Sequence, residues 1–221
     1  MTHKKIEWIF FDMGGVILND DEVETRRQKA LLNILQPLDT TITMAKVQET
    51  WWIASGTVGS IWKNTLRLLL PGYSQLDLLE IKFLELVPNG TYASTIFVRP
   101  EAKDVLEILS KKYNLGIIAN QSASVTEKLV GADILKYFSH QKVSAHHGLE
   151  KPDPAYFASV LHDTGADPNK SVLVDDNWPR GLLPAKNLGM TTVLYKRNIW
   201  SYPKNHPDYT ILNLKDLLTV T

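Results

Sequence analysis

The sequence predicts an α/β protein in which a helical segment interrupts a parallel sheet after its first strand. Three observations lead to this prediction. Short apolar runs alternate with amphipathic helical patterns through the second half of the 221-residue chain, as in strand–helix–strand units. Four helical patterns with no convincing strand among them fill residues 20–92. With 44% hydrophobic residues, the chain can bury a substantial core.

The first strand is predicted at residues 8–11, with the sequence Trp-Ile-Phe-Phe. Four consecutive apolar residues are too few for a helix and indicate a strand that is buried on both faces. Asp12 follows directly, and Gly14 and Gly15 allow a sharp turn beside it. Ligands of parallel sheets bind beyond the carboxyl ends of the strands, so Asp12 is placed for chemistry. An aspartate that only caps a turn would give the same pattern.

The helical segment that follows has apolar residues at helical spacing in four stretches. These stretches are residues 23–35, 44–54, 61–70 and 77–86. We therefore predict a core domain formed by residues 1–18 and 97–221, and a separate helical domain at residues 19–96. Aromatic residues at helical spacing are usually part of a core, so Trp51, Trp52 and Trp62 are more simply explained as core residues than as substrate contacts.

The second half of the chain alternates between strands and helices. Strands are predicted at residues 115–119, 141–144, 171–174, 191–194 and 209–212, and helices at 100–109, 124–130, 154–164 and 181–188. The third of these helices has the clearest ends, with Asp153 as N-cap, Pro154 in the first turn and Gly165 at the C-terminus. His146 and His147 are adjacent and do not form a helical i, i+4 metal pair, so we interpret them as loop residues.

Composition excludes several classes of function. The chain has no cysteine, which excludes disulfides, thiol catalysis and thiolate metal sites and is compatible with the cytoplasm, where we expect the protein. The formal net charge is zero without runs of like charge, so we expect no nucleic acid and no membrane as partner. No stretch reaches the ~18 apolar residues of a membrane helix, and the N-terminal apolar run is interpreted as a strand. The sequence allows a monomer or a homodimer.

Polar residues follow three of the predicted strands: Asp12, Asn120 and the pair Asp175-Asp176. The carboxyl ends of parallel strands share one edge, so these side chains are expected to meet there. Carboxylates that converge in a cleft repel one another, and Mg²⁺ bound by oxygen ligands removes that repulsion. Lys151, just before a helix, could supply positive charge for an anion. Together these features suggest phosphoryl transfer.

Four segments resemble, in order, the motifs of the haloacid dehalogenase (HAD) superfamily. They are residues 11–16 (FDMGGV), 117–120 (IIAN), 150–153 (EKPD) and 174–177 (VDDN). The helical segment after the first motif is similar to the family's α-helical cap of the first type. The resemblance covers essentially the whole chain. It implies a Rossmann-like core whose parallel sheet has the order 3-2-1-4-5.

The resemblance also implies roles for individual residues. Asp12 would be the nucleophile that becomes an aspartyl-phosphate. Mg²⁺ would be held by Asp12, the backbone carbonyl of Gly14, and Asp176, with Asp175 as a further acidic ligand or outer-shell partner. On this basis the protein is expected to be a phosphatase that acts on a small phosphorylated metabolite, possibly a sugar phosphate.

The phosphate and the substrate would be bound by other parts of the chain. The resemblance implies that Lys151 neutralises charge on Asp12 and on the phosphoryl oxygens, and that Asn120 and Gln121 bind the phosphate. The cap would close over the cleft, exclude water and choose the substrate.

Two positions depart from the family's pattern. Most phosphatases of the family have an acid–base aspartate two residues after the nucleophile, where this chain has Gly14. Such assistance is worth about 10²–10⁴ in rate. Ala119 stands where a serine or threonine would contact the phosphate. These departures leave two alternatives open: a metal-independent 2-haloacid dehalogenase-type hydrolase, against which the pair Asp175-Asp176 argues, and a catalytically weak HAD-fold binding protein.

Overall fold

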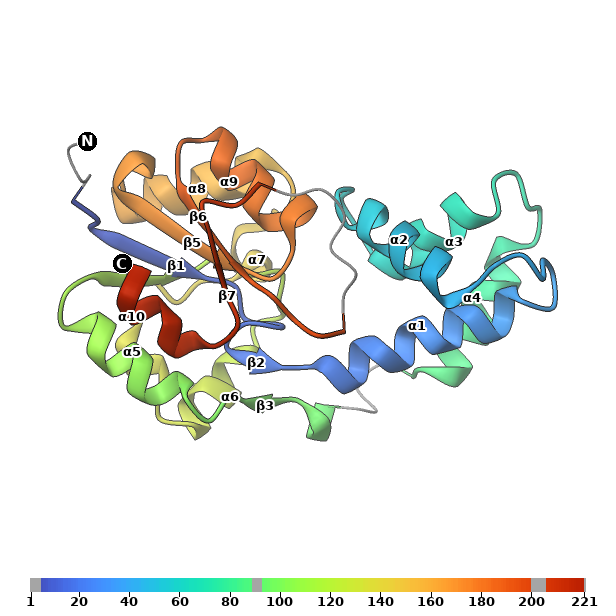
Figure 1. Ribbon diagram of the computed structural model, residues 1–221, viewed down its shortest axis with the longest axis horizontal. Helices are drawn as coiled ribbons and strands as arrows, with labels where there is room; N and C mark the ends of the chain where they lie inside the picture. Colours follow the sequence, from blue (N-terminus) through green and yellow to red (C-terminus); the bar gives the residue numbers. More distant parts are fainter. Residues whose placement is uncertain (1–4, 89–92, 200–205, 221) are drawn as a thin grey trace. The chain divides into compact units, whose positions relative to one another are not determined.

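The computed structural model describes residues 5–88, 93–199 and 206–220 (Figure 1). The chain divides into two compact units. The first lies within Met1–Asn19, Val98–Arg197 and Asn205–Thr221, and the second lies within Asp20–Phe97 and Asn198–Lys204. Each unit has its own buried core. Within the described ranges, every helix is too short or too polar to cross a lipid bilayer.

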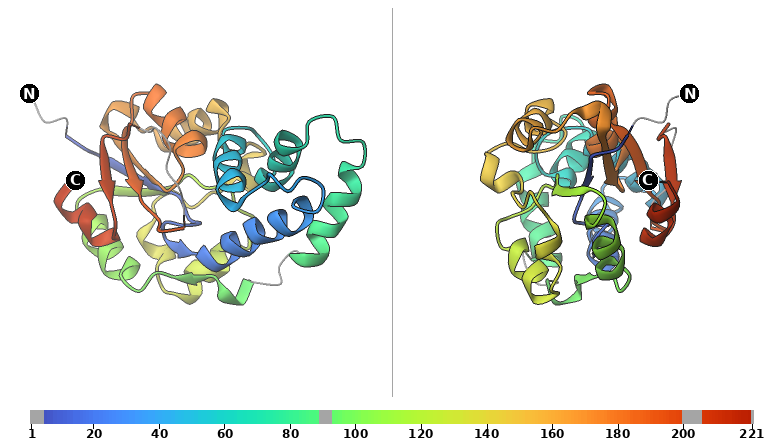
Figure 2. Two further views of the ribbon diagram at one scale, coloured as in Figure 1. Left: turned by 45° about the vertical axis from the view of Figure 1, so that its right-hand side comes forward. Right: turned by 90° about the vertical axis from the view of Figure 1, so that its left-hand side faces the viewer.

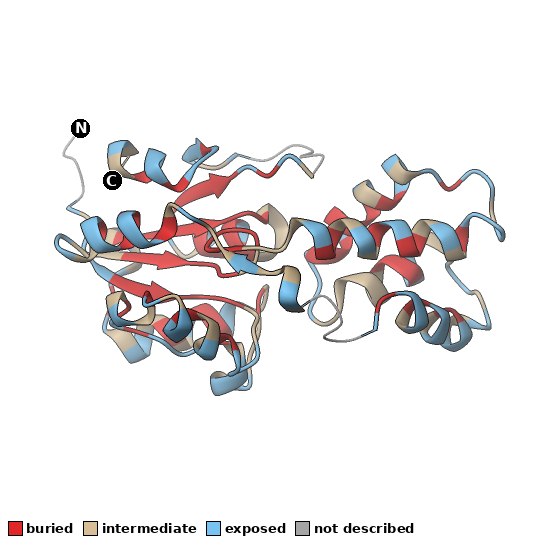
Figure 3. Ribbon diagram, turned by 90° about the horizontal axis from the view of Figure 1, so that it is seen from below, coloured by how far each residue is buried: buried red, intermediate tan, exposed pale blue. Residues whose placement is uncertain are grey.

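The first unit is built on a five-stranded sheet in which all neighbouring strands are parallel. Its strands, in spatial order, are β4 (Asn114–Ile117), β1 (Trp8–Phe11), β5 (Ser171–Asp175), β6 (Thr191–Tyr195) and β7 (Tyr209–Ile211). The central strands are buried because helices cover both faces of the sheet, as Figure 3 shows. The predicted α/β class with a parallel sheet is confirmed.

Helices α8 (Pro154–Thr164) and α9 (Leu183–Asn187) lie on one side of the sheet, and α5 (Ala102–Ser110) and α10 (Leu217–Val220) lie on the other (Figure 2). The remaining helices of this unit are α6 (Val125–Gly131) and α7 (Ser144–His147). Its short helical turns are η2 (Leu135–Tyr137), η3 (Pro168–Lys170), η4 (Trp178–Leu182) and η5 (Leu214–Asp216), whereas η1 (Ala93–Thr95) belongs to the second unit. The predicted ends of α8 are confirmed. The Asp153 side chain accepts a hydrogen bond from Ala155 N at the start of the helix, and Gly165 adopts a left-handed conformation at its end.

One predicted strand is wrong. Residues 141–144 form no strand, and a single parallel bridge between His140 and Gly116 stands in its place. The chain instead enters α7, where Val143 N donates to the Nδ1 atom of His146 at 3.1 Å. This side-chain hydrogen bond caps the helix and competes with strand pairing. His146 and His147 are therefore helical residues, not loop residues.

The second unit contains the four predicted helices, α1 (Asp21–Leu35), α2 (Met44–Ser55), α3 (Ile61–Leu69) and α4 (Leu76–Leu86). Their apolar faces form one core that includes Leu35, Trp51 and Phe83. The Trp62 ring stacks on Phe83 with centroids 4.2 Å apart. Trp51 and Trp62 are therefore accounted for by packing within this unit. Strands β2 (Leu18–Asn19) and β3 (Phe97–Val98), which form a small separate sheet, were not predicted because two residues carry no detectable period.

Candidate active site

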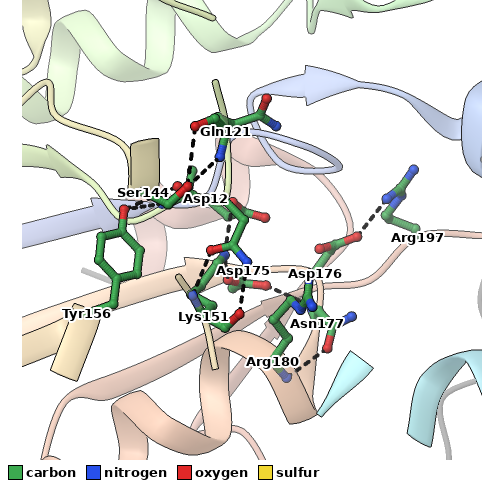
Figure 4. Close-up of polar contacts among 12 residues, drawn as sticks. Asp12, Gln121, Ser144, Lys151, Tyr156, Asp175, Asp176, Asn177, Arg180 and Arg197 are labelled. Atoms are coloured by element: carbon green, nitrogen blue, oxygen red, sulfur yellow. Dashed lines mark hydrogen bonds and ion pairs between the residues drawn. The ribbon is translucent and has the colours of Figure 1, made fainter. Parts of the chain in front are cut away.

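Three carboxylates meet at the carboxyl edge of the sheet (Figure 4). Asp12 follows β1, Asp175 is the last residue of β5, and Asp176 comes next. The turn after β1 is fixed to the neighbouring strand because Asp12 N donates to Val174 O at 2.9 Å. One carboxylate oxygen from each aspartate lies within 4.8 Å of the others. The parallel register of β1 and β5 thus brings together side chains that are more than 160 residues apart in sequence.

Lys151 lies between two of these carboxylates. Its Nζ atom is 2.7 Å from Asp175 Oδ2 and 3.0 Å from Asp12 Oδ1, and the side chain is 2% exposed. Burial alone would lower the pKa of Lys151, but the two carboxylates outweigh burial and raise its pKa above the usual value. Lys151 is therefore a permanent positive charge held against Asp12.

The third carboxylate has a different partner. Arg197 Nη1 lies 2.7 Å from Asp176 Oδ2, and both side chains are buried. Our sequence analysis did not identify Arg197. Arg197 follows β6 by two residues, at the same edge of the sheet. Because ligands bind beyond the carboxyl ends of parallel strands, the position that indicates a role for Asp12 also indicates one for Arg197.

Carboxylates crowd together in this cluster. Three of them lie with Lys151 and Arg197, and each repels the others when it is ionised. Burial, together with the nearby Asp175 and Asp176, raises the pKa of Asp12 to about 7 despite the opposing effect of Lys151. Burial also raises the pKa of Asp175. Carboxylate oxygens that converge on one point are the ligand set that Mg²⁺ takes in proteins, so these residues fit that ion.

Two glycines leave room for the acidic pair. Gly15 has φ +76°, and a Cβ atom there would collide with the Asp176 carboxylate and the Arg197 guanidinium. Gly181, in the π-helical turn η4, lies so close to Asp175 that a Cβ atom would overlap its carboxylate. The sequence analysis assigned Gly181 only to the start of a helix and missed this close approach.

Asn120 holds the loop that carries the lysine. Its Oδ1 atom accepts a hydrogen bond from Lys151 N at 2.7 Å, and its Nδ2 atom donates to Lys151 O at 2.9 Å. The side-chain amide thus binds both backbone groups of Lys151. Gln121 is fixed through its own backbone, since its N–H donates to Ser144 Oγ at 3.1 Å. Binding of phosphate by Asn120 and Gln121 remains a prediction.

Tyr156 contacts the position where the family's serine or threonine is missing. Its Oη atom is 3.2 Å from both the backbone N and the backbone O of Ala119. The tyrosine is fully buried, and burial raises its pKa to about 12. The helix at residues 154–164 was predicted, but nothing in its sequence pattern indicates that the hydroxyl of Tyr156 fixes this loop.

Comparisons with known proteins identify the family of the chain. A family model described as haloacid dehalogenase-like hydrolase matches residues 6–189. A glyceraldehyde 3-phosphate phosphatase from Pyrococcus furiosus is 29% identical over 98% of this chain and 93% of its own length. The crystal structure of a HAD phosphatase from Thermococcus onnurineus is 25% identical, covers 97% of both chains and superposes with a TM-score of 0.62.

A 2-haloacid dehalogenase from Pseudomonas syringae pv. Tomato shares the fold as well, with a TM-score of 0.59 at 22% identity over 97% of both chains. The fold therefore does not separate phosphatases from dehalogenases. The family model, however, spans most of the chain and includes Asp12, Lys151 and the acidic pair. The chain belongs to the haloacid dehalogenase-like hydrolase family.

Proposed function

We propose that the protein is a Mg²⁺-dependent phosphomonoester hydrolase that acts on a small phosphorylated metabolite through an aspartyl-phosphate at Asp12. The observation that carries this proposal is the convergence of three buried carboxylates, Asp12, Asp175 and Asp176, on one point at the edge of the sheet, with Lys151 against two of them. A phosphatase needs such a cation site, whereas dehalogenation needs only the nucleophile. The names of relatives, which include glyceraldehyde 3-phosphate phosphatase and phosphoglycolate phosphatase, support a short phosphorylated substrate.

In the proposed reaction, an Asp12 carboxylate oxygen attacks phosphorus, and the bond from phosphorus to the leaving oxygen breaks. Lys151, 3.0 Å away, favours the ionised form of Asp12 and offsets the charge that builds up on the phosphoryl oxygens. Gly14 offers no acid, so the leaving alkoxide takes its proton from water. A second water hydrolyses the acyl phosphate, which releases inorganic phosphate and restores the carboxylate.

The residues that would hold Mg²⁺ are Asp12, the carbonyl of Gly14, Asp175 and Asp176. When bound there, the ion supplies positive charge for the phosphate and for the crowded carboxylates. The helical unit keeps its predicted role as the cap that selects the substrate.

The test is hydrolysis of p-nitrophenyl phosphate and of a panel of sugar phosphates, including glyceraldehyde 3-phosphate, with Mg²⁺ and with a chelator. We expect phosphate release that requires Mg²⁺ and is lost in Asp12→Asn. The surface variant Asp104→Asn, in the first turn of α5, serves as the matched control and should keep wild-type activity. Mass spectrometry of the acid-quenched wild type should find one phosphoryl group on the peptide that contains Asp12.

Halide release from a 2-haloacid without added metal, together with no phosphate release, would overturn the proposal in favour of a dehalogenase. No turnover of either substrate class would favour a phosphate-binding protein.

A further inference from the structure

A second cluster of potential metal ligands lies in the sheet unit and uses none of the residues described above as the candidate active site. His140 follows η2, His147 ends α7, and Asp163 lies near the end of α8. Each offers a ligand atom, and these atoms lie within 4.8 Å of one another. The two imidazole rings have centroids 5.9 Å apart, with their planes inclined at 38°. Three separate segments of the chain therefore converge on one point.

The histidine nitrogens in this cluster lack protein partners. His140 is 8% exposed, and neither of its ring nitrogens has a hydrogen bond within the part of the chain that the structure describes. The Nε2 atom of His147 is also buried without a hydrogen-bond partner there. Leaving a buried polar atom unpaired costs about 1–3 kcal/mol. Such atoms call for an explanation, and a bound metal ion is one of the recognised ones.

The hydrogen bonds around His147 favour one tautomer of its ring. Ser159 Oγ donates to Tyr156 O at 2.8 Å, and with its hydrogen placed there it accepts from His147 Nδ1 at 3.0 Å. This tautomer has the proton on Nδ1 and a lone pair on Nε2. Metal-binding histidines are typically oriented in this way, with one ring nitrogen held by a neighbour and the other free for the ion.

The surrounding charges are compatible with a cation. Burial lowers the pKa of both His140 and His147, so both rings are neutral and able to bind a metal near pH 7. Asp163 brings a negative charge. Its Oδ2 atom contacts Lys142 Nζ at 2.8 Å, and its Oδ1 atom lies 3.8 Å from His162 Nδ1. Lys142 is 56% exposed and can move into solvent when an ion binds.

We propose that His140, His147 and Asp163 form a binding site for a divalent transition-metal ion of the Zn²⁺ type. Two imidazoles and one carboxylate suit Zn²⁺, Co²⁺ or Ni²⁺, whereas Mg²⁺ prefers oxygen ligands only. Ligand atoms bound to tetrahedral Zn²⁺ at about 2.0–2.2 Å lie roughly 3.3 Å apart, so small side-chain rotations close the site. Water would complete the coordination. The site would join α7 and α8 to the segment after η2.

The test uses the full-length protein, stripped of metal and then kept in excess Mg²⁺. Titration with Co²⁺ is followed by visible absorption, which is strong for tetrahedral nitrogen-containing sites and weak for octahedral oxygen sites. We expect one equivalent of Co²⁺ to bind with a strong visible band that Zn²⁺ removes. The band should persist in Asp176→Asn, because that variant alters only the carboxylate site at the sheet edge.

His147→Gln and Asp163→Asn should each weaken Co²⁺ binding at least 10-fold. His206→Gln, at an exposed histidine in the same unit, should leave it unchanged. Ser159→Ala removes only the neighbour of His147 Nδ1, so it should weaken binding by about 10-fold or more while all ligands remain. Circular dichroism confirms that each variant is folded. No visible band in the wild type, or equal binding by His147→Gln and His206→Gln, would overturn the proposal.

Discussion

At the scale of single residues, the position that departs most from the family's pattern is Gly14. If the missing acid limits the rate, then Gly14→Asp should raise kcat on alkyl phosphates. General acid–base assistance of about 10²–10⁴ in rate sets the upper range of the gain. The backbone can accept the change because Gly14 is not among the glycines with positive φ. Steady-state kinetics on sugar phosphates measures the effect.

The comparison of wild type with Gly14→Asp also needs a substrate whose leaving group requires no proton. p-Nitrophenolate leaves without protonation, so Gly14→Asp should change its hydrolysis far less than that of a sugar phosphate. Equal gains on both substrates would mean that residue 14 acts on the enzyme's geometry and not on the leaving group.

Among the glycines described above, Gly181 leaves the least room for an added Cβ atom. In Gly181→Ala, the added methyl group overlaps the Asp175 carboxylate, so the carboxylate and Lys151 must shift. Misplacing a catalytic group by about 1 Å can cost 10²-fold in rate, and we expect a loss of kcat of at least about that size. Gly131→Ala is the matched control, because a Cβ atom at Gly131 meets nothing within 4 Å. The control should keep full activity, and the measurement is kcat in saturating Mg²⁺.

The raised pKa of Asp12 predicts a pH dependence of stability in the metal-free protein. The folded state holds a proton on Asp12 up to about pH 7, whereas the model value for an unperturbed aspartate is 3.8. Between these values the folded state binds more protons, so the contribution of Asp12 to the free energy of unfolding falls as pH rises. Asparagine does not titrate. In urea unfolding with a chelator present, the free energy of unfolding of Asp12→Asn relative to that of wild type should therefore rise from pH 4 to pH 7. A difference that does not change with pH would contradict this.

At the scale of elements, the Asn120 side chain joins the loop beyond β4 to the loop before α8. Asn120→Ala leaves the buried N–H and C=O groups of Lys151 unpaired. Each unpaired group costs about 1–3 kcal/mol, and Lys151 loses its fixed position. We expect lower stability in urea and lower kcat together. Asn64→Ala, which removes two exposed hydrogen bonds, one to Val58 O and one from Arg67 Nη1, should cost no more than about 1 kcal/mol.

The elements that could be predicted are those with strong local signals. The ends of α8 follow from Asp153 and Gly165, and the four helices of the second unit follow from their apolar period. The strand expected at residues 141–144 failed because four residues give no reliable period, and a hydrogen bond to His146 decided the outcome. Arg197 and Tyr156 were missed because tertiary contacts, not local pattern, give them their roles.

At the scale of the whole molecule, the parallel sheet explains why the candidate site could be anticipated at all. Polar residues after parallel strands share an edge whatever their distance in sequence, so Asp12 and the acidic pair were expected to meet. The pairing of His140 with His147 could not be anticipated in this way. It depends on where α7 and α8 pack, and no period or motif in the sequence specifies that packing.

The division into two units predicts how the protein unfolds. Leu35 belongs to the core of the helical unit and Leu115 to the core of the sheet unit, and both are 0% exposed. Replacing a buried leucine by alanine costs about 2–5 kcal/mol. Because each unit buries its own core, Leu35→Ala should speed amide hydrogen exchange in α1–α4 while β1 and β5 stay protected. Leu115→Ala should have the opposite effect. If either variant speeds exchange equally in both units, the two unfold as one cooperative body, and the helical unit is not an independent cap.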